Sequence, residues 1–109
     1  MILFHACKLS HFRGDFVVPA NYWHQHLPKL VHFAESRDKA MQWIRNPLAR
    51  WSLWAIDSDD VPGLEPNPRY LGHWQTAKPV PVSAFMHVQT FNPELGEIQR
   101  VVDYVEALL

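Results

Sequence analysis

The order of sequence patterns predicts a single α+β domain. Apolar runs typical of short strands occur at residues 2–6, 31–34, 51–57 and 84–91. Helix patterns follow only the second and the last of these runs, too few and too unevenly placed for a doubly wound sheet. The chain has 109 residues, of which 48% are hydrophobic, enough for one domain over residues 1–109 with one core.

The first strand is expected at residues 2–6. Side chains of a strand alternate between two faces, so Leu3 and His5 share one face while Phe4 and Ala6 share the other. A strand this close to a chain terminus usually lies inside a sheet, because a free terminus would otherwise fray. We therefore expect this strand at an inner position.

A second strand is expected to end in a polar turn and run into a helix that extends to residue 44. Val31 and Phe33 share one strand face and His32 lies on the other. Ser36 is a suitable N-cap for the helix, and Asn46-Pro47 ends it. A strand that leads into a helix N-terminus often forms one wall of a nucleotide pocket, but the same arrangement also serves as plain framework.

The second half is expected to contain two further strands and one helix. The run at residues 51–57 is rich in aromatic residues and stops at a Ser-Asp-Asp turn. The run at residues 84–91 leads to Asn-Pro-Glu, a helix start, and an amphipathic helix is expected over residues 93–108. Residues 58–72 are expected to form a long surface loop. Shorter extended segments are expected at residues 16–18, 71–77 and 80–82.

Composition narrows the classes of function. The net charge is -1 and no basic run occurs, so nonspecific binding of nucleic acid is not favoured. A single cysteine excludes an internal disulfide framework and fits a reducing compartment. No apolar run reaches the length of a membrane span, and the N-terminus lacks the basic region of a signal peptide. We expect a cytoplasmic protein with no membrane association.

Three features of the sequence invite a chemical interpretation, but each also has a simpler one. His24 and His26 could bind a metal, but no second histidine pair at zinc-ligand spacing occurs, and loop histidines bonded to solvent or backbone are the simpler interpretation. Cys7 at a strand end could be a nucleophile, but a small buried side chain is the simpler interpretation. The acidic group Asp57, Asp59 and Asp60 could hold Mg²⁺ or form a solvated turn, and we favour the turn.

Histidines on the first two strands suggest another chemistry. From neighbouring strands, His5 could bond a ribose hydroxyl while the pair His32 and Phe33 stacks on a flat base. The same residues could equally occupy ordinary sheet positions that bind no ligand, and composition alone does not decide between the two. No glycine-rich phosphate loop, HExxH motif or GxSxG motif occurs.

Four short motifs, in order, resemble the ADP-ribosyltransferase fold. They are Leu-Phe-His-Ala at residues 3–6, Val-His-Phe-Ala-Glu-Ser at 31–36, Leu-Trp-Ala-Ile-Asp at 53–57, and Lys-Pro-Val-Pro-Val at 78–82. The sequence is most similar to small bacterial and phage members, such as the rifampin-modifying enzymes, and to a small bacterial domain of unknown function. The resemblance covers most of residues 2–91 and implies a split antiparallel sheet with flanking helices.

The resemblance also implies that NAD is bound as a substrate, with ADP-ribose transferred to a macromolecule or small molecule. His5 would bond the ribose hydroxyls and the backbone of Ala6 would hold the nicotinamide amide. His32 or Phe33 would stand in the place of the family's stacking aromatic residue, and Ser36 would lie beside it.

One position departs from the family pattern. The family usually has an acidic residue just before the Pro-x-Pro segment, where it bonds the ribose 2′-hydroxyl and stabilises the positive sugar. Here Gln75 or His73 takes that place. An amide can bond the hydroxyl but cannot counter a positive charge. The resemblance therefore implies nucleotide binding more directly than it implies transfer.

Two alternatives remain open. A non-catalytic relative would bind a nucleotide, or a protein partner through the aromatic loop at residues 21–28. A phosphate-handling relative, similar to the RNA 2′-phosphotransferases, would need basic residues in the site, so convergence of Arg37, Arg69 and Lys78 on His5 would favour it.

Overall fold

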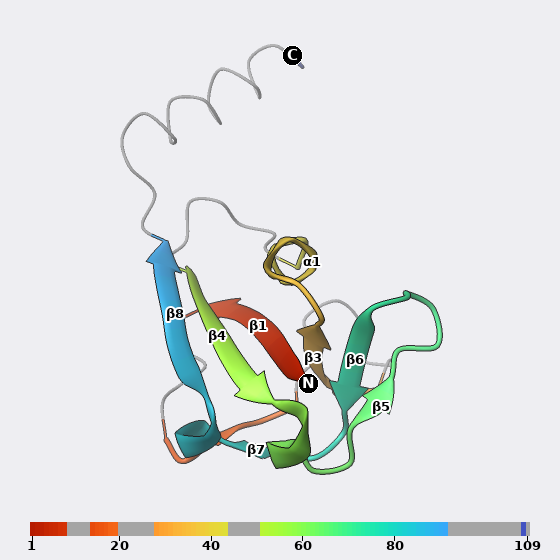
Figure 1. Ribbon diagram of the computed structural model, residues 1–109, viewed down its shortest axis with the longest axis vertical. Helices are drawn as coiled ribbons and strands as arrows, with labels where there is room; N and C mark the ends of the chain where they lie inside the picture. The colour runs from red at the N-terminus through yellow and green to blue at the C-terminus, as the bar shows by residue number, and fades with distance from the viewer. Residues whose placement is uncertain (9–13, 20–27, 44–50, 92–107, 109) are drawn as a thin grey trace.

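The computed structural model describes residues 1–8, 14–19, 28–43, 51–91 and 108, and most of them lie in or next to β-strands (Figure 1). The strands are β1 (Ile2–Lys8), β2 (Phe16–Val17), β3 (Val31–Ala34), β4 (Trp51–Asp57), β5 (Glu65–Pro66), β6 (His73–Thr76), β7 (Val80–Pro81) and β8 (Met86–Phe91). The helix α1 (Arg37–Met41) follows β3, and 3-10 turns η2 (Ser58–Asp60) and η3 (Val82–Ala84) precede β5 and β8.

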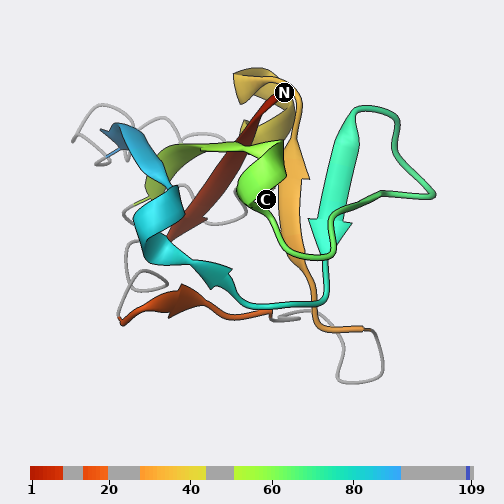
Figure 2. The same cartoon turned by 60° about the horizontal axis from the view of Figure 1, so that its bottom comes forward.

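Six strands form one antiparallel sheet in the order β5-β6-β3-β1-β4-β8. The first strand, β1, lies inside the sheet as expected and pairs with β3 and β4 (Figure 1). The other two strands, β2 and β7, form a separate antiparallel pair (Figure 2). The strand patterns at the start, in the second run and at residues 51–57 are confirmed.

The predicted α+β class with flanking helices is wrong. In the described part of the chain the protein is mostly β, and its one α-helix, α1, has five residues. The N-cap is confirmed, because the Oγ of Ser36 accepts a hydrogen bond from the backbone N of Lys39 at 3.2 Å. The helix nevertheless ends at Met41, three residues before the expected end at residue 44. The helix expected at residues 93–108 lies almost wholly outside the described residues.

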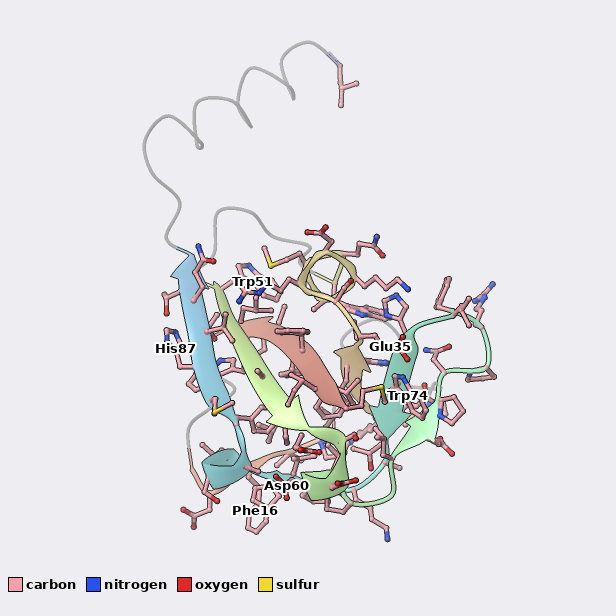
Figure 3. All side chains as sticks on the ribbon, viewed as in Figure 1. Phe16, Glu35, Trp51, Asp60, Trp74 and His87 are labelled. Carbon is pink, nitrogen blue, oxygen red and sulfur yellow. The ribbon has the colours of Figure 1, made fainter. Side chains whose placement is uncertain are left out.

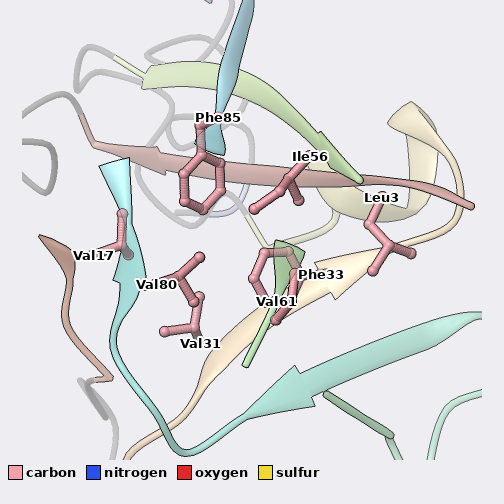
Figure 4. Close-up of a cluster of buried hydrophobic side chains, with 8 residues drawn as sticks. All are labelled: Leu3, Val17, Val31, Phe33, Ile56, Val61, Val80 and Phe85. Atoms are coloured by element: carbon pink, nitrogen blue, oxygen red, sulfur yellow. The ribbon is translucent and has the colours of Figure 1, made fainter. Parts of the chain in front are cut away.

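The main hydrophobic core covers one face of the six-stranded sheet. It is formed by Leu3, Val17, Val31, Phe33, Ile56, Val61, Val80 and Phe85 (Figure 4). Because β2 and β7 supply two of these side chains, the small strand pair closes this face. A smaller cluster on the other face joins the sheet to α1 through Ala34, Ala40 and Leu53. The two faces of the sheet therefore differ: one is covered by the main core, and the other carries α1.

Candidate functional site

A row of three polar side chains crosses the α1-bearing face of the sheet. Directly opposite residues in antiparallel strands share a face, and His32 on β3 pairs with Gln75 on β6. Gln75 in turn pairs with Glu65 on β5. The Nε2 of Gln75 donates a hydrogen bond to Oε1 of Glu65 at 3.1 Å. The register thus brings an imidazole, an amide and a carboxylate into line across three strands.

Trp43 covers one end of this row. Its ring stacks on that of His32 with a centroid distance of 4.6 Å and an interplanar angle of 19°. The short helix α1 sets this position, because Trp43 follows two residues after its end and its backbone N donates to the carbonyl of Ala40 at 3.2 Å. A ring stack of this kind adds about 0.5–1.5 kcal/mol beyond the buried area.

His73 lies edge-on between two aromatic rings. Its centroid is 5.7 Å from Trp43 at 83° and 6.0 Å from Tyr70 at 68°. The Nε1 of Trp43 donates to Nδ1 of His73 at 3.3 Å, which places the proton of the neutral imidazole on Nε2. We call His32, Trp43, His73 and Tyr70 the ring cluster.

Both imidazoles of the ring cluster favour the neutral form. Burial lowers the pKa of His32, and the nearby His73 lowers it further. Burial also lowers the pKa of His73, with a further contribution from the positive charge of Lys39. In the described part of the chain, Nδ1 of His32 is buried and has no hydrogen-bond partner. A buried polar atom left in this state costs about 1–3 kcal/mol.

The loop between β5 and β6 borders the ring cluster and is held by its own hydrogen bonds. The Oδ1 of Asn67 accepts from the backbone N of Arg69 at 2.8 Å and of Tyr70 at 3.2 Å. Gly72 has φ +79, and a Cβ there would collide with Nζ of Lys39. That Nζ donates to the carbonyl of Leu71 at 3.3 Å. Gly72 therefore permits the loop to approach α1 and places a lysine charge beside the ring cluster.

The predicted site residues divide between the two faces of the sheet. His32, His73 and Gln75 come together on the α1-bearing face. Phe33, next to His32, points to the opposite face and is 0% exposed in the main core. His5 lies with Phe33: their ring centroids are 5.6 Å apart.

The other predicted residues have structural contacts. Nδ1 of His5 donates to the carbonyl of His32 at 2.6 Å, so His5 braces the backbone of β3 from the core side. Ala6 packs on the smaller hydrophobic cluster, and the Ser36 side chain caps α1. The single pocket expected to join His5 with residues 73–75 is therefore split by the sheet, while the ligand roles of these residues stay predictions.

The three basic residues that would favour a phosphate-handling site do not converge on His5. The guanidinium of Arg37 lies 5.9 Å from the ring centroid of Phe4, and that of Arg69 lies 5.9 Å from the ring centroid of Tyr70. The side chain of Lys78 runs along Gly63. The described geometry does not favour the phosphotransferase alternative.

Cys7 and the acidic group fit their simpler interpretations. Burial raises the pKa of the Cys7 thiol to about 12, although its hydrogen bond with Ser52 lowers it in part, so the thiol stays protonated. Oδ1 of Asp57 accepts from the backbone N of Asp59 at 3.0 Å and caps η2, which confirms the turn. His24 and His26 lie outside the described residues.

Sequence reasoning missed Trp43, Tyr70 and Glu65 as site residues. The sequence predicted only that Trp43 lies within the helix expected to extend to residue 44, whereas α1 ends at Met41 and leaves Trp43 just beyond its end. Tyr70 and Glu65 fell in a predicted loop, and only the pairing of β5 with β6 brings Glu65 to Gln75. That pairing depends on tertiary structure and leaves no local signal.

Comparison with known proteins adds no relative. No helix within the described residues has the length and apolarity needed to span a membrane. The chain matches no protein-family model, no curated protein and no solved structure.

Proposed function

We propose that this protein binds a nucleotide, NAD or a related one, through the ring cluster and the polar row beside it. The observation that carries the proposal is the stack of His32 on Trp43, with the neutral His73 edge-on to the same indole. Flat, uncharged rings in contact form a surface on which a base or a nicotinamide ring can stack. Base stacking on aromatic side chains contributes about 1–3 kcal/mol per base.

Polar atoms of the ring cluster can hold such a ring in one orientation through hydrogen bonds. Nε2 of His73 carries the proton and can donate to a carbonyl oxygen, because Nδ1 already accepts from Trp43. One ring can therefore be both stacked and hydrogen-bonded.

Positive charge next to the ring cluster suits a phosphate. Lys39 is close enough to affect the pKa of His73, and Arg69 lies against the ring of Tyr70, which is 50% exposed. A phosphate attached to a stacked nucleoside would find both cations at the border of the cluster. This charge favours a nucleotide over a free base.

Calorimetric titration of NAD into the purified protein tests the proposal, with Trp43→Leu as the probe. Removing the stacking ring should weaken NAD affinity about tenfold or more, the equivalent of 1.4 kcal/mol or more. Trp74→Leu is the matched control, because Trp74 lies on the same strand as His73 but on the other face. Absence of NAD binding to the wild type, or equal weakening by the two substitutions, would contradict the proposal.

A second candidate is a protein-binding role, and one observation favours it. Leu71 is 95% exposed beside the half-exposed Tyr70 on a loop already held by hydrogen bonds. A preformed loop loses little entropy on binding, so its apolar tip suits contact with a partner. If NAD does not bind, Leu71→Ser and a search for partners become the next experiment.

A further inference from the structure

A row of apolar residues crosses the α1-bearing face of the sheet from β3 to β8. Phe4 on β1 lies opposite Ala34 on β3 and opposite Ala55 on β4. Ala55 in turn lies opposite Met86 on β8. Directly opposite residues in antiparallel strands share a face, so these four side chains form one apolar surface.

The outer part of this apolar surface is exposed. Met86 is 63% exposed, and Ile2, which shares the strand face of Phe4, is 46% exposed. The helix α1 packs on the inner part, where its Ala40 joins the smaller hydrophobic cluster. Figure 3 shows His87, the neighbour of Met86 on β8, at the side of the sheet away from Trp74. We call the surface formed by Ile2, Phe4, Ala55 and Met86 the open face.

The C-terminal segment carries apolar residues that suit the open face. They recur at the spacing of one helix side and are Leu95, Ile98, Val101, Val102, Val105 and Leu108. A helix over residues 93–108 has a length of about 24 Å, comparable to the roughly 20 Å of the six-residue strand β8. In the described part of the segment, Leu108 is helical and 69% exposed.

The open face and the segment belong to one chain, yet their described residues do not cover each other, because Leu108 and Met86 are both largely exposed. We propose that two copies of the chain pair by exchange, with residues 93–108 of each copy packed on the open face of the other. A twofold axis gives both copies the same two contacts. The ring cluster lies beside β3 and β6, so this pairing does not depend on the proposed nucleotide binding.

Charge also favours this occupant of the open face. The segment has one basic residue, Arg100, against four acidic residues, Glu94, Glu97, Asp103 and Glu106. At the border of the open face, the guanidinium of Arg37 lies 5.9 Å from the ring centroid of Phe4. A cation beside an apolar surface is complementary to a helix with an apolar side and a mainly acidic one.

Light scattering on the purified full chain tests the pairing, and we expect a dimer within a range of about 1 to 100 μM. Met86→Glu places a charge on the open face, and Val102→Glu places one among the apolar residues of the segment. Each should raise the dissociation constant of the dimer about a hundredfold or more, because burying an unpaired charge is costly. Leu71→Glu is the matched control: Leu71 is 95% exposed on the loop before β6, and its substitution should leave the dimer intact.

Mixing the two interface variants tests the exchange itself. Met86→Glu keeps an intact segment and Val102→Glu keeps an intact open face, so a mixed pair has one sound contact while each variant alone has none. The mixture should therefore form dimers at the upper end of the concentration range, which a variant that had lost its fold could not do. The proposal is wrong if the wild type is monomeric, if either single variant stays dimeric, if Leu71→Glu loses the dimer, or if the mixture stays monomeric.

Discussion

Replacing Gly72 with alanine tests whether NAD binding depends on the position of the loop and of Lys39 beyond any change in the stability of the fold. Gly72 has φ +79, a left-handed conformation that costs a residue with a Cβ about 1–2 kcal/mol. The new Cβ would also collide with Nζ of Lys39, whose flexible end must then give up its hydrogen bond to Leu71. The lower entropy of the unfolded alanine chain offsets about 0.4–1 kcal/mol. We expect Gly72→Ala to lower the free energy of unfolding by about 1–2 kcal/mol.

The same substitution should weaken NAD binding about tenfold, since displacing Lys39 removes a charged contact worth at least about 1.4 kcal/mol. Gly63→Ala is the matched control: its φ is also positive, +63, and its Cβ would meet the aliphatic Cδ of Lys78 at 3.1 Å, away from the ring cluster. Urea unfolding should give similar losses for both variants, while calorimetry should show weaker NAD binding only for Gly72→Ala. Equal affinities of the two variants for NAD would refute the role given to Lys39.

Two further predictions concern the imidazoles and the core. The pKa values of His32 and His73 are lowered in the folded state, so the unfolded chain, near the ordinary value of 6.5, takes up protons first as the pH falls. The stability that these groups contribute is complete above about pH 6.5 and is lost as the pH falls through 6.5, with a slope of at most about 1.4 kcal/mol per pH unit for each group. Urea unfolding between pH 8 and 5 measures this dependence of the unfolding free energy on pH. If His73→Gln leaves the slope unchanged, the prediction is wrong. Phe33→Ala should cost about 3–5 kcal/mol of unfolding free energy, because Phe33 is fully buried. A variant as stable as wild type but unable to bind NAD would instead make Phe33 a ligand residue.

A strand could be predicted from the sequence where its own residues carry the apolar pattern. The run at residues 51–57 coincides with β4 because its apolar residues are continuous and a polar turn ends it. The short strand β5 was assigned to a loop, since two residues, Glu65 and Pro66, carry no periodicity and are defined only by pairing with β6. The class was wrong for a related reason: spacing alone extended α1 beyond Met41 and gave helices a larger share of the fold than the described residues contain.

The candidate site was predictable only in part, because the order of strands along the chain does not determine which side chains of neighbouring strands share a face of the sheet. His5 and His32 both occur in the expected strands, but the register Phe4 to Ala34 puts the side chains of Leu3 and His5 on the face of Phe33. A resemblance that assigns His5 and His32 to one ligand cannot detect this division. Conversely, Glu65 and Trp43 reach the row through β5 and the end of α1, and neither segment carried a motif.

The register of β6 is the feature on which the site depends. A slip of one residue would turn Gln75 into the core and bring Trp74 onto the polar row, because successive side chains of a strand face opposite ways. Thr76 opposes such a slip: it is fully buried, its Oγ1 donates to the carbonyl of Pro62 at 2.5 Å and also accepts from the backbone N of Lys78 at 3.2 Å. The core-facing Thr76 therefore fixes the strand whose other face aligns His32, Gln75 and Glu65. The proposed binding site and the packing of the core are thus set by the same four-residue strand, β6.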